Sequence, residues 1–401
     1  MGEPEVGRRT IFIPYQPKTI LNKSKRADHW FWSRYSAYPY IGCQHGCAFC
    51  YCRERKYSPY DDPHDFAYQI KVKENAPELL GRALRRVPVD VVFTGDYQPA
   101  ERKFGVSRRM LEVCRDLAFP VFVLERSPLV VRDLDLLREI HKRAGAIVAF
   151  SIISTADAPG AARVRRIENL APATEKRFAA MEKIASAGIT TGTCAMPLLP
   201  ELCDDEATLT ALVRETREHG GQFVLAGGLT LADQQREYFM GELAREVPDL
   251  AARYETLYPA GSYGPSEGSW RPTARRVREL CAEYGIRDRV PRPIVAGDKR
   301  TLNKRLVEWL ANEAYSMDLA GDTRRMWEYR KAAWAIEDLP QEIGLVQRTL
   351  GARGLASVPG ISEKMAGEIE AWVRRANLAP AMPYQPEGAG TQMKPIDKEG
   401  G

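Results

Sequence analysis

Between residues 67 and 260 the chain alternates short apolar, β-branched runs with longer charged stretches, and this alternation constrains the fold more than any other feature. The apolar runs VDVVFTGD, PVFVLER, AIVAFSI, ITTGTCAMPLLP and QFVLAGGL have the length and composition of strands buried on both faces. A stretch with helical periodicity follows each run. Repeated strand–helix units predict an α/β fold with a parallel sheet and right-handed crossovers, and five or six such units suit a full or partial β/α barrel. A doubly wound sheet is the alternative.

A cluster of cysteines precedes most of these units. Cys43, Cys47 and Cys50 lie in the segment YIGCQHGCAFCYC at the spacing C-x3-C-x2-C. Eight cysteines in 401 residues are too sparse for a disulfide scaffold, so the crowding indicates reduced thiols that bind a metal. Zinc is the alternative, but a closed zinc site usually needs a second cysteine pair. Three thiolates on one loop can hold three corners of a cubane iron–sulfur cluster and leave the fourth iron without a protein ligand.

Two further residues of the segment need separate interpretations. Phe49 would cover one side of the cluster. Cys52 has no place in the spacing, and we interpret it as a small buried residue or a spare thiol, with an alternate ligand or redox partner as the other possibility.

The spacing CxxxCxΦC, after a short strand at 38–41 and before β/α repeats, resembles the radical S-adenosylmethionine (SAM) superfamily. The resemblance implies that Cys43, Cys47 and Cys50 hold a [4Fe-4S] cluster whose open iron binds the amino and carboxylate groups of SAM. It also implies that one electron from the cluster cleaves SAM to methionine and a 5′-deoxyadenosyl radical, which abstracts hydrogen from the substrate. An electron donor such as flavodoxin or ferredoxin would then be needed.

A longer series of segments resembles the spore photoproduct lyase-related branch, whose members are often labelled DNA repair photolyases. The segments span residues 20 to about 230 and are ILNKS, YPYIGCQHGCAFCY, IKVKENAPELL, TGDYQPAE, VRDLDLL, SIIST and AGITTGTCAMPLLPELCDD. Spore photoproduct lyase itself has a hydrogen-donating cysteine just before the aspartate that corresponds to Asp96, where this chain has Phe-Thr-Gly. Cys194 could donate hydrogen instead, although a buried cysteine in an apolar strand more often has a packing role.

Several polar residues at predicted strand ends are candidates for binding SAM, because sites of β/α barrels form at the carboxyl ends of the strands. Asp96 could accept from the SAM ammonium, and Lys73 could reach its carboxylate or a substrate phosphate. The alternatives are a helix cap for Asp96, a solvated lysine for Lys73 and a turn residue for Ser151. The complete candidate set is Phe49, Lys73, Thr94, Asp96, Ser151 and Glu168.

The stretch TRRMWEYRKAAWAIEDLPQEIG, followed by LASVPGISEKMAGEIEAWV, resembles the helix-hairpin-helix domain at the N-terminus of family X DNA polymerases. This resemblance implies sequence-independent binding of DNA phosphates by backbone N–H groups of the hairpin, where Gly360 allows the sharp turn. A structural or protein-binding four-helix module is the alternative. The candidate DNA-binding residues are Val358, Gly360, Ser362, Lys364, Arg330 and Lys331.

The predicted organisation has five parts. They are an extended basic lead-in (1–34), a partial (β/α)6-type TIM barrel (35–258), a Gly/Pro-rich linker (259–298), a small all-α helix-hairpin-helix domain (299–376) and a disordered tail (377–401). No apolar run approaches the ~20 residues that cross a bilayer, and the N-terminus lacks a signal-like apolar stretch, so we expect a cytoplasmic protein.

These observations favour a radical SAM enzyme that acts on DNA and repairs a damaged base. A base inside the stack would have to be flipped out to meet a radical buried in a barrel, which costs least for a damaged base. With 58 basic against 53 acidic residues, the overall charge is not itself an indication of nucleic-acid binding. The alternatives are a radical SAM enzyme that modifies RNA or a peptide, and a nucleic-acid-binding protein with a structural cluster.

Overall fold

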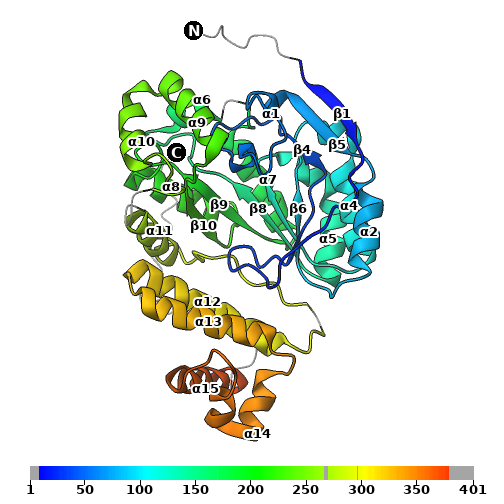
Figure 1. Cartoon of the computed structure of the whole chain (residues 1–401), viewed down its shortest axis with the longest axis vertical. Coiled ribbons are helices and arrows are strands. Elements are labelled where there is room, and N and C mark those ends of the chain that lie inside the picture. The colour runs from blue at the N-terminus through cyan, green and yellow to red at the C-terminus, as the bar shows by residue number, and fades with distance from the viewer. Residues whose placement is uncertain (1–8, 169, 266–269, 296, 379–401) are drawn as a thin grey trace, which may run out of the picture.

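The computed structural model describes residues 9–168, 170–265, 270–295 and 297–378 (Figure 1). Its main sheet has seven strands in the order β10-β9-β8-β7-β6-β3-β2. All neighbours from β3 to β10 are parallel, and only β2 is antiparallel to its neighbour. The strands are β2 (Asn22–Lys23), β3 (Tyr35–Ser36), β6 (Val92–Gly95), β7 (Val121–Glu125), β8 (Ala146–Ser151), β9 (Thr190–Leu198) and β10 (Val224–Gly228).

The order of the parallel strands follows the chain without reversal, as in a β/α barrel that is left open. A doubly wound sheet reverses its strand order at a switch point, so that alternative is wrong. The five expected strand–helix units are present. Their helices are α4 (Val106–Asp116), α5 (Leu134–Arg143), α7 (Thr174–Ser186), α8 (Glu206–Glu218) and α9 (Asp233–Glu246). Shorter helices are α3 (Ala100–Phe104) before α4, α6 (Ala161–Ile167) before α7 and α10 (Ala251–Leu257) after α9.

The lead-in and the segment predicted as a linker are more structured than expected. Strand β1 (Ile11–Tyr15) pairs with β5 (Gln69–Lys73), which also pairs with β4 (Tyr40–Ile41), while α1 (Asp65–Tyr68) and α2 (Ala76–Leu84) flank β5. The linker prediction for 259–298 is wrong over α11 (Arg271–Glu283), whose buried side chains pack against α8 and β10. Residues 379–401 of the predicted tail lie outside the described residues.

The C-terminal region consists of four helices below the sheet (Figure 1). They are α12 (Thr301–Ala320), α13 (Thr323–Asp338), α14 (Ile343–Ala356) and α15 (Glu363–Leu378). Buried residues of α12 and α13 form one hydrophobic cluster with Phe122, Ile147 and Phe223 of the sheet. The helical region therefore shares a hydrophobic cluster with one face of the sheet and does not have a core entirely of its own. No described helix is long and apolar enough to cross a membrane.

The two faces of the sheet are buried by different partners. Val123 and Val148 are paired across β7 and β8 and pack in the cluster formed with helices α4, α5 and α7. The alternate positions Phe122 and Ile147 face the lead-in and α12–α13. We call the face with Phe122 and Ile147 the inner face. Because parallel strands buried on both faces are apolar throughout, the continuous apolar runs predicted these strands well.

Candidate active site

The loop with the three cysteines, residues 42–50, lies at the carboxyl ends of the parallel strands. Its backbone is held from two sides, because Cys43 N donates to Phe66 O (2.8 Å) and Ala48 N donates to Ile167 O (2.9 Å). Gly42 has a φ of +86°, and a Cβ there would lie 2.5 Å from the carbonyl oxygen of Gln69. The loop therefore needs glycine at this position, and we call residues 42–50 the Cys loop.

Arg53 supports the Cys loop from beneath and was not among the predicted site residues. Its fully buried guanidinium donates to the carbonyl oxygens of Cys47 (3.2 Å), Gly46 (2.9 Å) and Pro63. It also lies over the ring of Tyr238, 3.9 Å from the ring centroid. The only sequence signal for this role was its position immediately after the cysteine segment, because all three acceptors are backbone atoms.

The three cysteines of the Cys loop are free thiols on one short loop, which is the donor set that an iron–sulfur cluster needs. All three are free; Cys47 is buried, and Cys43 and Cys50 are half-buried. Among the described residues, no group of three His, Cys, Asp or Glu side chains is gathered to hold one metal ion. In a cubane cluster each thiolate binds a different iron, so the sulfurs stand further apart than ligands of one ion.

Arg126 places a positive charge beside the Cys loop. Burial lowers the pKa of this guanidinium, but the neighbouring Cys47 thiolate and the Glu168 carboxylate outweigh burial and raise it. The guanidinium lies 5.0 Å from the centroid of the Phe49 ring and forms an ion pair with Glu168. A permanent cation at this place stabilises thiolates, and so does the hydrogen bond from Cys52 that lowers the pKa of Cys50 to about 6.

Asp96 follows β6 and lies near the Cys loop. Its backbone has a φ of +76°, and its N–H donates to the carboxylate of Glu125. Burial raises the pKa of Asp96 to about 7, while the hydrogen bond from Gln98 Nε2 (3.0 Å) and the charge of Lys73 lower it. The helix-cap alternative is wrong, because helix α3 begins at Ala100 and receives no side-chain cap.

The segment TGDYQPAE connects Asp96 to the Cys loop through Gln98, which was also not predicted. Gln98 Nε2 donates to Gly42 O (2.9 Å), and Gln98 Oε1 accepts from Gln44 N (3.0 Å). In return, Gln44 Oε1 accepts from Ala100 N (2.6 Å). Two glutamines therefore fix the distance between β6 and the Cys loop.

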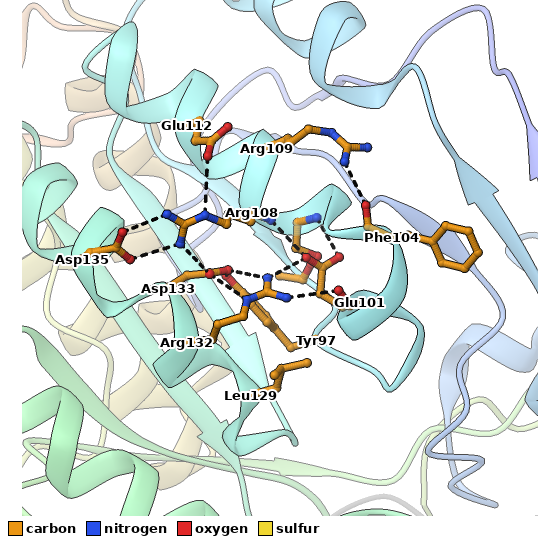
Figure 2. Close-up of polar contacts among 12 residues, drawn as sticks. Tyr97, Glu101, Phe104, Arg108, Arg109, Glu112, Leu129, Arg132, Asp133 and Asp135 are labelled. Atoms are coloured by element: carbon orange, nitrogen blue, oxygen red, sulfur yellow. Dashed lines mark hydrogen bonds and ion pairs between the residues drawn. The ribbon is translucent and has the colours of Figure 1, made fainter.

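The remaining polar residues of this segment anchor the helices behind the site, as Figure 2 shows. Tyr97 donates to Asp133 (2.9 Å), while Arg132 pairs with Glu101 (2.8 Å) and Arg108 with Asp133 (2.8 Å). Glu101 and Asp133 are fully buried, so both carboxylates depend on these partners. This network holds α3 and α4 to the 3-10 helix η2 (Pro128–Asp133) that follows β7.

Glu168 and Ser151 lie at the same edge, but their polar atoms already have protein partners. The Glu168 carboxylate pairs with Arg126 and with the buried Arg177 (3.2 Å), and Arg177 also donates to Ser151 O (3.0 Å). Ser151 Oγ donates to Met196 O (3.2 Å). Either residue would have to share these contacts in order to bind a hydroxyl group of SAM.

Of the three remaining predicted residues, Lys73 lies in the site region, whereas Thr94 and Cys194 do not present free side chains to it. Lys73 Nζ donates to Tyr38 O (2.8 Å) near Asp96, so it belongs to the site region, and burial lowers its pKa. Thr94 is paired with Val123 and therefore points to the helix-covered face, where its buried hydroxyl has no hydrogen-bond partner among the described residues. This position does not favour a side-chain contact with SAM. Cys194 is fully buried in the apolar cluster on the inner face, which favours a packing role.

Comparisons with known proteins agree with this geometry. Residues 38–212 match the radical SAM superfamily, and the matched part contains the Cys loop and Asp96. The chain belongs to the radical SAM superfamily. Members of this superfamily bind a [4Fe-4S] cluster and SAM, so these are the cofactors of the protein.

Two groups of relatives extend the comparison beyond the matched domain. The "Uncharacterized protein Rv2578c" of Mycobacterium tuberculosis is 32% identical over 278 residues, which is 67% of this chain and 79% of that protein. The "Uncharacterized protein MJ0683" of Methanocaldococcus jannaschii is 28% identical over 176 residues, or 43% of this chain and 64% of that protein. Neither name indicates a substrate, so the comparisons establish the radical SAM domain and not the molecule on which it acts.

Proposed function

We propose that this radical SAM protein holds its cluster with Cys43, Cys47 and Cys50 and binds SAM with Asp96 and Lys73. The observation that carries the proposal is the convergence of the Cys loop, Asp96 and Arg126 at the carboxyl edge of the parallel sheet, with Lys73 near Asp96 at the end of β5. When bound and reduced, the cluster supplies the electron that cleaves SAM to a 5′-deoxyadenosyl radical. An external one-electron donor such as flavodoxin or ferredoxin would provide that electron.

Different side chains would bind SAM, balance the charge of the thiolates and exclude water. The Asp96 carboxylate would accept from the SAM ammonium, and the Lys73 ammonium would donate to its carboxylate. Arg126 would offset the negative charge of the thiolates, while Phe49 and the buried backbone of the Cys loop keep water away. Phe49, Glu168 and Ser151 would line the site rather than provide free ligands.

We further propose that the substrate is DNA and that the enzyme repairs a lesion, as spore photoproduct lyase-related proteins do. The support is the ordered series of similar segments from residue 20 to about 230, together with the hairpin between α14 and α15. The hydrogen donor would differ from that of spore photoproduct lyase, because Gly95 precedes Asp96 and a Cβ there would lie 2.5 Å from the Glu125 carboxylate.

The hairpin has local features suited to backbone binding of phosphates. Gly360 has a φ of +94°, and Ser362 Oγ accepts from Met365 N (3.2 Å), which caps the start of α15. Val358, Gly360 and Ser362 would present backbone groups, and Lys364 with Arg330 and Lys331 would add positive charge. A purely structural hairpin remains the competing interpretation.

One experiment tests both the proposed cleavage of SAM and the proposed DNA substrate. Reduced protein is incubated anaerobically with SAM and a panel of damaged oligonucleotides, and both 5′-deoxyadenosine and the mass of the DNA are measured. We expect 5′-deoxyadenosine to form and one lesion to change mass. Absence of SAM cleavage by iron-loaded protein would overturn the assignment of the site, whereas cleavage with all lesions unchanged and an RNA or peptide modified would overturn only the DNA substrate.

A further inference from the structure

Helix α13 carries a stripe of large polar and aromatic side chains on its outward face. Trp327, Arg330, Lys331 and Trp334 follow the i, i+3, i+4, i+7 spacing of a single helix face. Trp327 is 41% exposed and Lys331 is exposed, whereas the opposite face of α13 is buried in the hydrophobic cluster. Two tryptophans on the solvent side of a helix that already has a buried face are not needed for its packing.

Trp327, Trp334 and Trp30 each have an arginine guanidinium over the ring. Arg330 lies 5.1 Å from the ring centroid of Trp327, and Arg26 lies 5.4 Å from that of Trp334. The third tryptophan is Trp30 of the lead-in, which is 37% exposed. Arg289 lies 4.8 Å from its ring centroid. We call these three pairs the Trp–Arg surface.

The three pairs are neighbours in space although they come from three parts of the chain. The rings of Trp327 and Trp334 are 6.1 Å apart between centroids. Arg26 forms an ion pair with Asp338 at the end of α13, which joins the lead-in to this helix. Burial lowers the pKa of His29 to about 4, and the positive charges of Arg292 and Arg330 contribute to this lowering. Burial and the charge of Arg330 also lower the pKa of Arg289.

The charge of the Trp–Arg surface is unbalanced. The acidic side chains around it already have cationic partners: Asp338 pairs with Arg26, Glu337 with Arg292 (2.7 Å) and Glu328 with Arg324 (3.7 Å). Within the described part of the chain, Arg330 and Lys331 have no acidic partner. These two cations are available to an anionic ligand, between two indole rings.

The hairpin adjoins the same helix face. A Cβ on Gly360 would lie 3.6 Å from both the carbonyl oxygen of Lys331 and the Cβ of Ala335. The turn therefore packs directly against α13, beside the two unpaired cations. The hairpin and the Trp–Arg surface form one continuous candidate surface, of which the sequence predicted the hairpin, Arg330 and Lys331 but not the tryptophans.

We propose that the Trp–Arg surface binds a single-stranded or locally unpaired nucleic-acid strand, with bases stacked on Trp327 and Trp334 and phosphates held by Arg330 and Lys331. Aromatic platforms beside cations are how proteins bind unpaired strands without sequence preference, because every base has a π-face. In an intact duplex the base faces are already stacked and unavailable to indoles. Tryptophan and arginine also mark protein interfaces, but the two unpaired cations beside the hairpin favour a polyanion. The proposal deepens the DNA substrate proposed above and rests on it for the biological role only.

The test compares strands and matched variants of the full-length protein. Fluorescence anisotropy measures binding of a labelled oligothymidylate of about 20 nucleotides and of a duplex of equal length, at low and moderate salt. We expect Trp327→Ala to weaken oligothymidylate binding about tenfold or more and Trp327→Phe to retain most of it. Lys331→Ala should weaken binding and reduce the salt dependence by about one charge. Lys142→Ala, which removes an exposed lysine from α5, should change neither.

Thermal unfolding of each variant checks that the fold is kept, which these exposed positions favour. The proposal is overturned if Trp327→Ala binds oligothymidylate as tightly as the wild type, or if wild-type protein binds only the duplex. It is also overturned if Trp327→Ala abolishes self-association of the protein and leaves oligonucleotide binding unchanged, since the surface would then be a protein interface. SAM cleavage without nucleic acid reports separately on the proposed active site and should be equal in all variants.

Discussion

Burial controls the protonation of Asp96, the carboxylate nearest to the proposed SAM position. Its pKa of about 7 in the folded protein lies above the ordinary value for aspartate, so folding favours the protonated form. Ionising Asp96 therefore lowers the stability of the protein as the pH rises from about 4 to about 7. The carboxylate form is nevertheless the one that accepts from an ammonium, so stability and ligand binding change in opposite directions with pH.

The affinity for SAM should therefore rise with pH. We expect about tenfold tighter binding at pH 8 than at pH 6, because the ionised fraction of Asp96 increases about tenfold across that range. Asp96→Asn should bind SAM more weakly and without this pH dependence, at a cost of about 1.5–3 kcal/mol at pH 8. Equilibrium binding of SAM to iron-loaded protein measures both effects. A flat wild-type profile would contradict the role of Asp96.

The cysteines provide a second test with single residues. Cys47→Ala should lose most of the bound iron and all SAM cleavage, because it removes one of the three proposed ligands. Cys52→Ala should keep most of the iron, since Cys52 lies outside the C-x3-C-x2-C spacing and acts on the ligand Cys50 through a hydrogen bond. Iron content and the absorbance of anaerobically prepared protein distinguish the two. Equal loss of iron in both variants would show that the ligand assignment is wrong.

At the scale of elements, local and remote signals account for what the sequence did and did not predict. The five strand–helix units were predictable because the apolar runs of strands and the periodicity of helices are local sequence patterns. The Cys loop was predictable because the spacing of its cysteines is also local. Strand β1 was missed because it is defined by pairing with β5, almost sixty residues later in the chain, and α11 because Gly/Pro-rich flanks concealed its helical pattern. Gln98 and Arg126 could not be assigned, because their contacts exist only once distant elements meet, and Arg53 could not, because its acceptors are backbone oxygens that leave no pattern in the sequence.

Arg53 holds the backbone of the Cys loop through hydrogen bonds to its carbonyl oxygens, and a substitution can test this role. Arg53→Met keeps much of the side-chain volume but leaves buried carbonyl oxygens of Gly46 and Cys47 without a donor. We expect a loss of about 2–4 kcal/mol in stability and weaker retention of iron. Arg55→Met, at an exposed position two residues later, should change neither quantity. Denaturant unfolding and iron content provide the comparison, and equal stability of the two variants would contradict the supporting role of Arg53.

For the whole molecule, the important feature is the separation of two surfaces. The Cys loop lies at the carboxyl ends of the strands, whereas α12–α13 and the hairpin lie below the sheet on the other side (Figure 1). A nucleic acid bound to the helical region would have to extend around the molecule to reach the proposed active site. A flexible single strand meets this requirement more readily than a straight duplex, which agrees with a surface built from stacking residues.

The shared hydrophobic cluster gives the last prediction, since it determines whether the helical region is removable. A chain that ends after residue 298 loses α12 and α13 and exposes part of the hydrophobic cluster that these helices form with Phe122, Ile147 and Phe223 of the inner face. A contiguous apolar patch of this kind promotes aggregation, so we expect the truncated protein to bind hydrophobic dyes and to precipitate. A chain that ends after Leu339 keeps α12–α13 and loses only the part of the cluster that α14 and α15 contribute, so we expect it to aggregate less and to retain its iron while losing the hairpin. Light scattering, dye fluorescence and iron content compare the two truncations. If the shorter chain is as stable and monodisperse as the longer one, the helical region is an independent appendage and the inner face needs no cover.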